Sequence, residues 1–200
     1  MAKDNVETEV KLYVTDLAAV ARKLADLNAP ITAPRVLERN SRYDNAAGDF
    51  NRTSTVLRLR MDTRARLTYK DGEKLRGDYG SSRTEIEVEV SDFDQMHILL
   101  GKLGFQQVMV YEKYRTTYQL EGAEVTLDEM PYGNFVEIEG EQDAIKRCVL
   151  ALGLDGARRM YASYTVLFSY VRRNLKLDFK DLTFENFQGI SVPESAFNEA

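Results

Sequence analysis

The chain has little cysteine and little histidine, because Cys148 and His97 are its only examples of either residue. A single cysteine excludes an internal disulfide framework and fits a reducing compartment. The sequence also lacks a Gly-rich phosphate-binding loop, a Ser-His-Asp set and a cysteine pair. No apolar run approaches the roughly 20 residues that span a bilayer, and the charged N-terminal residues do not resemble a signal peptide. We therefore expect a cytoplasmic protein without membrane contact.

Basic residues are fewer than acidic ones. The 27 Lys and Arg side chains and 32 Asp and Glu side chains give a formal net charge of −5. Such a chain is poorly suited to bind nucleic acid through its whole surface, so we expect no nucleic-acid partner. Its 200 residues, 44% of them hydrophobic, fit one core-forming domain with a small addition. We expect a domain at residues 1–172 and a C-terminal appendage at 173–200, in a monomer or a homodimer.

Four segments have the apolar spacing of amphipathic helices. Thr15 is the expected cap of the first, and Ser91 with Asp94 forms a capping pair before the second. The predicted helices cover residues 17–27, 93–103, 141–152 and 163–174.

Between these segments apolar and polar residues alternate in short runs, which is typical of strands with one apolar and one polar face. Glycines fall between several runs, where hairpin turns are expected. Residues 45–54 and 71–82 are predicted to be polar loops. The predicted strands are 6–12, 55–61, 66–70, 83–90, 112–120, 125–128 and 134–139.

The polar face of nearly every predicted strand carries full charges, because side chains alternate across a strand. These charges occur as short groups of defined sign. The groups are Glu7, Glu9 and Lys11; Arg58 and Arg60; Arg66 and Lys70; Arg83, Glu85, Glu87 and Glu89; Lys113 and Arg115; Asp128; and Glu137 and Glu139.

A solvated sheet face is the simplest explanation of this pattern, since antiparallel sheets often expose one polar face. Three features favour an enclosed face instead. The helices need apolar surface to cover, and the apolar strand faces are the only large supply. The charges occur as doublets, and both signs are present in comparable number, which avoids the repulsion of one sign. Together these features predict an α+β fold in which a closed antiparallel β-barrel has a charged lumen and helices packed outside.

Acidic doublets inside such a lumen would repel one another unless a cation lay among them. Hard divalent cations take oxygen ligands, and Mg²⁺ usually binds through one or two carboxylates together with substrate phosphates. Lys and Arg complement phosphate charge, and Arg does so with two parallel hydrogen bonds. The sequence chemistry therefore favours a site for a metal and a polyphosphate.

The charged groups, in their order along the chain, resemble the CYTH superfamily of triphosphate tunnel metalloenzymes. The E-x-E-x-K motif near the N-terminus is weak alone, and the ordered motifs that follow it make the resemblance specific. It covers residues 3–170 and rests on E-T-E-V-K at 7–11, R-N at 39–40, Y-D at 43–44, L-R-L-R at 57–60, L-T-Y-K at 67–70, R-T-E-I-E at 83–87, K-Y-R at 113–115, L-D at 127–128, G-N-F-V-E-I-E at 133–139 and S-Y at 163–164.

The resemblance implies a closed eight-stranded antiparallel tunnel and a role for each inner residue. The metal, Mg²⁺ or Mn²⁺, would be held by Glu7, Glu9, Asp128, Glu137 and Glu139. The triphosphate would be held by Lys11, Arg58, Arg60, Lys70, Arg83, Lys113 and Arg115. Tyr43, Lys70 and Lys11 would be catalytic, with Tyr43 and Lys70 in the positions of a Tyr–Lys pair that assists the attacking water. Glu85 and Glu87 would lie in the tunnel without an assigned role.

Several functions remain open at this point. The same metal and basic residues would serve a triphosphatase, which directs water at the terminal phosphorus, and a class IV adenylate cyclase, which makes cyclic AMP and pyrophosphate from ATP. The L-R-L-R and L-T-Y-K segments resemble the triphosphatase branch of the family more than the cyclase branch. The resemblance therefore implies a metal-dependent phosphohydrolase acting on tripolyphosphate, thiamine triphosphate or a similar small triphosphate. A polyphosphate- or nucleotide-binding module without catalysis, and a charged barrel used for protein contacts, are the remaining alternatives.

Overall fold

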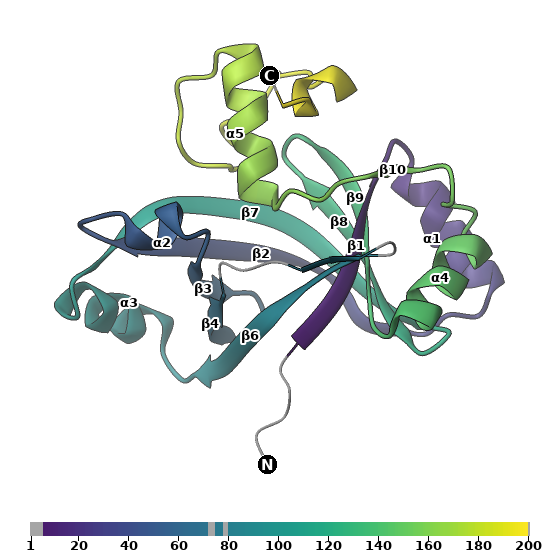
Figure 1. The fold of residues 1–200 in the computed structure, drawn as a ribbon, viewed down its shortest axis with the longest axis horizontal. Coiled ribbons are helices and arrows are strands. Elements are labelled where there is room, and N and C mark those ends of the chain that lie inside the picture. The colour runs from purple at the N-terminus through teal and green to yellow at the C-terminus, as the bar shows by residue number, and fades with distance from the viewer. Residues whose placement is uncertain (1–5, 72–74, 78–79, 200) are drawn as a thin grey trace.

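The computed structural model describes residues 6–71, 75–77 and 80–199, and the side chains of 8–71 and 84–199. Within these residues the chain forms an antiparallel sheet and several helices (Figure 1). The strands are β1 (Val6–Val14), β2 (Ile31–Asn45), β3 (Val56–Met61), β4 (Ala65–Lys70), β5 (Leu75–Gly77), β6 (Gly80–Val90), β7 (Phe105–Leu120), β8 (Ala123–Met130), β9 (Gly133–Glu139) and β10 (Arg158–Arg159). The helices are α1 (Leu17–Asp26), α2 (Asp49–Arg52), α3 (Phe93–Lys102), α4 (Gln142–Ala151), α5 (Tyr164–Leu175) and the 3₁₀ helix η1 (Glu194–Phe197).

The strands lie in the order β10-β1-β9-β8-β7-β2-β3-β4-β6-β5, with an additional pairing between β1 and β6. β1 uses Glu9–Val14 to pair with β9 and Val6–Glu9 to pair with β6, so both of its edges are hydrogen-bonded. The predicted α+β class and antiparallel sheet are confirmed. The closed eight-stranded tunnel stays a prediction.

The helices begin close to the predicted positions, but two caps differ. Asp16, not Thr15, caps α1 by accepting a hydrogen bond from the Ala19 amide, and Asp92 caps α3 in the same way through Gln95. Aspartate is as good a cap as serine or threonine, so the sequence signal did not separate neighbouring candidates. The predicted loops also contain short elements, α2 in one and β5 in the other.

Three of the helices, α1, α3 and α4, pack on the outer, apolar face of the sheet in separate clusters. α1 and α4 cover one part around Leu12, Val125 and Ile138, whereas α3 covers β2 and β3 around Leu59 and Leu100. Figure 1 shows α1 and α4 at one end of the molecule and α3 at the other. The charged strand faces turn away from these three helices, whereas α5 contacts the charged face through Tyr164, which donates to Asp128. No helix in the described part of the chain is both long and apolar enough to cross a bilayer.

The C-terminal segment packs with α5 above the sheet (Figure 1). Leu182 donates its amide to the Val110 carbonyl and accepts from the Glu112 amide, both at 2.9 Å, and so attaches the segment to β7. Phe187 and Phe197 are buried with Phe168 of α5 in one aromatic cluster. α5 and the tail are therefore held against the same side of the sheet.

Candidate functional site

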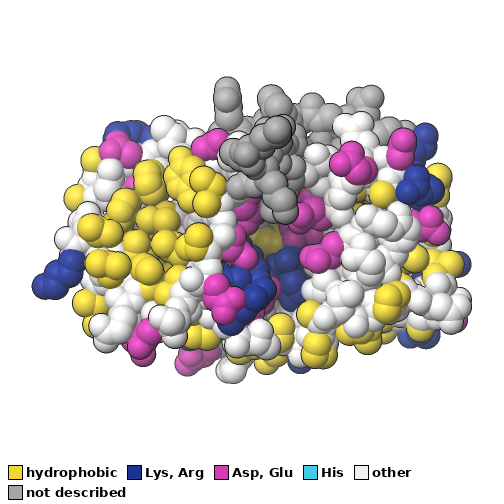
Figure 2. Space-filling model, turned by 90° about the horizontal axis from the view of Figure 1, so that it is seen from below, with side chains coloured by type: hydrophobic (Ala, Val, Ile, Leu, Met, Phe, Trp, Pro, Cys, Tyr) yellow, Lys and Arg dark blue, Asp and Glu magenta, His cyan; other side chains and the backbone are white. Residues whose placement is uncertain are grey.

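A cavity of about 1330 Å³ runs along the charged face of the sheet. Figure 2 shows Lys, Arg, Asp and Glu side chains gathered around a hollow in the middle of one face of the molecule. The charged residues that line the cavity from the long strands are Glu9, Lys11, Arg42, Asp44, Arg58, Arg60, Arg66, Lys70, Glu85, Glu87, Lys113, Arg115, Glu124, Glu137 and Glu139.

The structure brings most of the predicted site residues to this one cavity. Six predicted phosphate-binding residues line it, namely Lys11, Arg58, Arg60, Lys70, Lys113 and Arg115, and so do the acidic residues Glu9, Glu85, Glu87, Glu137 and Glu139. The backbones of Glu7 and Arg83 lie opposite each other in the β1–β6 pair. Their side chains lie outside the described residues, so their roles stay predictions.

Asp128 is placed differently from the other predicted metal ligands. Its side chain is fully buried behind the cavity wall. It accepts hydrogen bonds from Lys113 Nζ at 3.0 Å, Arg115 Nε at 2.7 Å and the Tyr164 hydroxyl at 2.7 Å. In this state Asp128 positions two cations instead of presenting a carboxylate to the cavity. A metal would bind here only after these donors were displaced.

Glu137 lies between two basic side chains. Lys11 Nζ is 3.1 Å from its carboxylate, and Arg115 also donates to it. Burial opposes ionisation of Glu137, but the charges of Lys11 and Arg115 outweigh it and hold its pKa well below the usual range. For Lys11, burial opposes the charge, but Glu137 and Glu9 raise the pKa. Because a general base must be deprotonated, Lys11 in this state is suited to bind phosphate and not to accept a proton.

Glu38 is a central residue that the sequence analysis missed. It is only 2% exposed and lies 3.5 Å from Lys113 Nζ, 3.6 Å from Arg60 and 4.0 Å from Arg115 Nε. Burial opposes its charge, but Lys113 and Arg115 lead the effects that lower its pKa. Alternation across E-R-N-S-R at 38–42 was the signal that places Glu38 on the inner face.

Tyr43 lines the cavity, as Lys70 does, and the catalytic role of the two as a pair stays a prediction. The ring of Tyr43 packs in the cluster under α3, and its hydroxyl lies 2.7 Å from His97 Nδ1. Lys70 forms an ion pair with Glu85. Arg42, the preceding residue of β2, lines the same cavity, and the β2–β7 register shifts between Arg42 and Tyr43.

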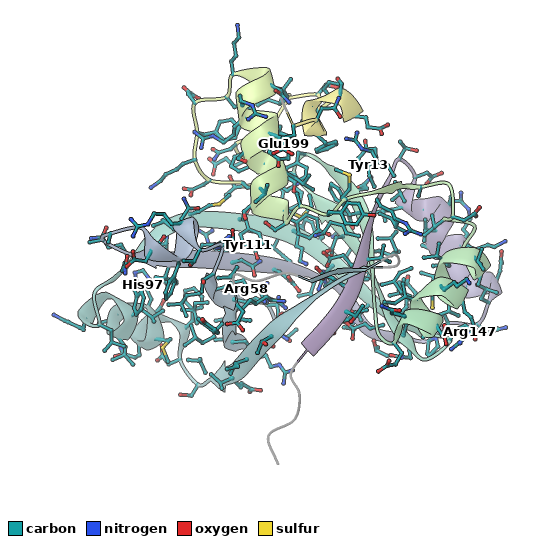
Figure 3. The ribbon with its side chains drawn as sticks, viewed as in Figure 1. Tyr13, Arg58, His97, Tyr111, Arg147 and Glu199 are labelled. Atoms are coloured by element: carbon teal, nitrogen blue, oxygen red, sulfur yellow. The ribbon has the colours of Figure 1, made fainter. Side chains whose placement is uncertain are left out.

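Tyr111 is a second missed residue of the inner face. Its hydroxyl accepts a hydrogen bond from Arg58 at 3.2 Å, and Figure 3 shows both side chains between the strands, with His97 on α3 apart from them. Burial raises the pKa of this phenol, but Arg58 and Arg60 outweigh burial and lower it. Tyr111 is therefore a polar group held among cations.

The carboxylates at the β1–β9–β8 end are the best candidates for holding a divalent metal. Glu9 lies directly opposite Glu139 in the register, and Glu139 lies opposite Glu124 of β8, so three acidic residues share one row. Like charges in directly opposite positions destabilise a sheet, and a bound cation would offset that repulsion. Within the described side chains, which omit Glu7, no group of three potential ligands is close enough to hold an ion. The donor chemistry fits Mg²⁺ or Mn²⁺, and the ligand set stays a prediction.

The arrangement defines a cavity lined by paired cations and carboxylates. A family model for the CYTH domain matches residues 5–148, and the chain belongs to that family. A protein of Methanocaldococcus jannaschii named "Putative adenylate cyclase MJ0240" is 31% identical over 136 residues, which cover 67% of this chain and 76% of that protein.

Solved structures support the same fold. The PH1819 protein of Pyrococcus horikoshii is 29% identical with a TM-score of 0.65, covering 79% of this chain and 95% of its own. A Hippeastrum protein described as a "putative adenylyl cyclase" with "a dominant" triphosphatase activity is 24% identical with a TM-score of 0.61, covering 82% and 95%. A Vibrio parahaemolyticus protein described as a "putative adenylate cyclase" has a TM-score of 0.72 at 17% identity, covering 84% and 99%.

Proposed function

We propose that this protein is a divalent-metal-dependent phosphohydrolase that releases the terminal phosphate of a small triphosphate such as tripolyphosphate or thiamine triphosphate. The observation that carries the proposal is the cavity itself, in which Lys and Arg side chains from β1, β3, β4 and β7 face acidic side chains from β1, β6 and β9. A polyanion can displace the carboxylates from these Lys and Arg side chains and bind in their place. The triphosphatase activity described for the Hippeastrum protein agrees with this choice.

We further propose that β1, β9, β8, β7, β2, β3, β4 and β6 enclose the cavity as a closed tunnel. The pairing of β1 with both β9 and β6 supports this closure, because it joins the two ends of the strand order. Enclosure removes bulk water from around the charges, and electrostatic interactions with phosphate then become stronger.

Within this tunnel each residue has a defined task. Lys11, Arg58, Arg60, Lys70, Lys113 and Arg115 bind and orient the phosphates, and Arg83 is assigned the same task from its register position. Glu9 and Glu139 hold the metal together with Glu7 and Glu137. When bound, the metal supplies charge neutralisation and lowers the pKa of a water molecule. Positioning and charge neutralisation account for most of the acceleration of phosphoryl transfer. Asp128 and Glu38 keep the basic side chains in place.

The test is incubation with Mg²⁺ or Mn²⁺ and, separately, tripolyphosphate, thiamine triphosphate and ATP, with phosphate and cyclic AMP measured together. Phosphate release from a triphosphate without cyclic AMP is the expected result. Cyclic AMP and pyrophosphate from ATP would replace the proposal by the cyclase activity in the name of the M. jannaschii relative. Glu9→Gln is the loss-of-function variant. Glu89→Gln is its matched control, because Glu89 forms an exposed ion pair with Arg64.

A further inference from the structure

Arg42 differs from the other basic side chains of the cavity in its partners. Lys11, Arg58, Arg60, Arg66, Lys70, Lys113 and Arg115 each form at least one ion pair with a carboxylate. Arg42 forms none within the described residues, although its guanidinium lines the same cavity. Its charge is therefore not compensated by a direct ion pair in this state.

The contacts of Arg42 are with neutral oxygen atoms. One terminal nitrogen donates to Thr165 Oγ1 of α5 at 2.9 Å, and the other donates to the Thr55 carbonyl at 3.3 Å. Its Nε is buried without a hydrogen-bond partner in the described structure. The nearby carboxylate of Asp44 accepts instead from the backbone amides of Asn45, Phe50 and Asn51.

A second guanidinium group lies beside Arg42, because Arg58 is directly opposite it in the β2–β3 register. Burial lowers the pKa of Arg42 and the neighbouring charge of Arg58 lowers it further, while Tyr111 and Asp44 act in the opposite direction. Arg58 in turn donates to the Tyr111 hydroxyl. Two guanidinium groups and a phenol thus converge near the end of the cavity that the first turn of α5 covers. An anionic ligand would relieve the repulsion between the two guanidinium groups and occupy the free Nε donor.

We propose that Arg42, with Arg58 and Tyr111, forms a phosphoryl-binding subsite at the α5 end of the cavity. This inference rests on the proposed triphosphate function and adds Arg42 to the residues that hold the substrate. The planar guanidinium suits the site because it can keep its bond to Thr165 while it donates through other nitrogens to phosphate oxygens.

The experiment measures tripolyphosphate binding by calorimetry in metal-free buffer, where hydrolysis does not interfere. Arg42→Met should weaken binding by about tenfold or more, which is the loss expected for one charge-assisted hydrogen-bonded contact. Arg42→Lys, which keeps the charge but not the fork of donors, should lose less. Arg39→Met is the matched control on the same strand, since Arg39 points outward to Glu112 and is exposed.

A purely structural role for Arg42 makes a different prediction. Thr165→Val removes the contact between Arg42 and α5 but leaves the charge in place. If Arg42 binds phosphate, the Thr165→Val variant should bind tripolyphosphate as tightly as the unmodified protein does. If Arg42 only anchors α5, this variant should bind tripolyphosphate as weakly as Arg42→Met does. The second result would overturn the proposal. Unchanged affinity of a folded Arg42→Met variant, verified by circular dichroism, would also overturn it.

The failure of this subsite and the failure of the hydrolase function are separable. Metal-dependent hydrolysis together with unchanged Arg42→Met binding would remove the subsite and leave the function. Binding that depends on Arg42 without any hydrolysis would leave the subsite and remove the function.

Discussion

Glu38 offers the sharpest test of how the charges around the cavity are stabilised. Glu38→Gln keeps the shape of the side chain but removes the negative charge that Arg60, Lys113 and Arg115 share at 3.5 to 4.0 Å. Loss of one partner from a buried charge network costs about 3–5 kcal/mol. Since Lys113 and Arg115 retain Asp128, we expect the lower end, about 3 kcal/mol. For a domain of this size that corresponds to a fall in Tm of roughly 6–12 °C.

The assay is thermal and urea unfolding without ligand, followed by unfolding with tripolyphosphate. Glu89→Gln is the control, because exposed ion pairs contribute less than about 1 kcal/mol. Tripolyphosphate should restore more stability to Glu38→Gln than to the unmodified protein, since the variant has a larger excess of positive charge. If Glu38→Gln unfolds at the same temperature as the unmodified protein, the contacts of Glu38 contribute no net stability and the reasoning fails.

The pH dependence of the same variant checks the sign of the effect. The pKa of Glu38 is lowered by folding, so its contribution is fully present above the unfolded-state value of about 4.3 and is lost as the pH falls towards the lowered folded value. Stability of the unmodified protein should therefore fall more steeply in acid than that of Glu38→Gln. Parallel acid profiles would show that Glu38 does not titrate with folding.

Three further outcomes follow from individual contacts. Tyr43→Phe should lower the free energy of unfolding by about 1 kcal/mol through loss of the His97 hydrogen bond, with phosphate release unchanged. A large loss of activity would instead support the catalytic role that the resemblance implies for Tyr43. Tyr164→Phe removes the hydroxyl that donates to Asp128 and should lower the free energy of unfolding, measured with urea, by about 1–3 kcal/mol. An unchanged free energy would mean that Lys113 and Arg115 alone satisfy the Asp128 carboxylate. Glu139→Gln should reduce metal-dependent phosphate release by more than about tenfold, while tripolyphosphate should still bind to the variant without metal. Retained phosphate release would exclude Glu139 as a metal ligand.

Strand alternation made most of the inner face predictable from the sequence. Wherever charged and apolar residues alternated clearly, as in β3, β4 and β9, the predicted inner residues line the cavity. Three of the four predicted helices, α1, α3 and α4, lie on the outer face, because the apolar strand faces require a cover. The fourth, α5, contacts the charged face instead. The order of the motifs along the chain, which resembles that of the CYTH family, then suggested roles for these inner residues that alternation alone cannot suggest.

β2 shows where two signals in the sequence differ. The resemblance places Tyr43 at the site, whereas the alternation of Glu38, Asn40 and Arg42 assigns the opposite face of the strand to Tyr43. In the structure Tyr43 lines the cavity and its ring packs in the cluster under α3, so its catalytic role stays a prediction. The β2–β7 register also shifts between Arg42 and Tyr43, an irregularity that depends on the partner strand and has no signal in β2 itself.

The burial of Asp128 was not predictable from its own strand. Alternation places it correctly on the inner face, but its removal from the cavity depends on Lys113 and Arg115 of β7 and on Tyr164 of α5. Tyr164 comes from a helix 36 residues further along the chain. Such long-range contacts are set by tertiary packing, and a local pattern carries no information about them.

The pairing of inner cations with carboxylates also bears on which ligands can bind. Lys11 and Arg115 share Glu137, and Lys113 and Arg115 share Asp128. A ligand must compete with these carboxylates for the same donors. A single phosphate group can reach fewer of these cations than a longer chain, and its gain is offset by each carboxylate left without a partner. A chain of three phosphates can engage several cations at once, and Arg42 provides a donor without a competing ion pair in the described residues. We therefore expect the internal ion pairs to favour binding of polyphosphates over binding of single phosphates.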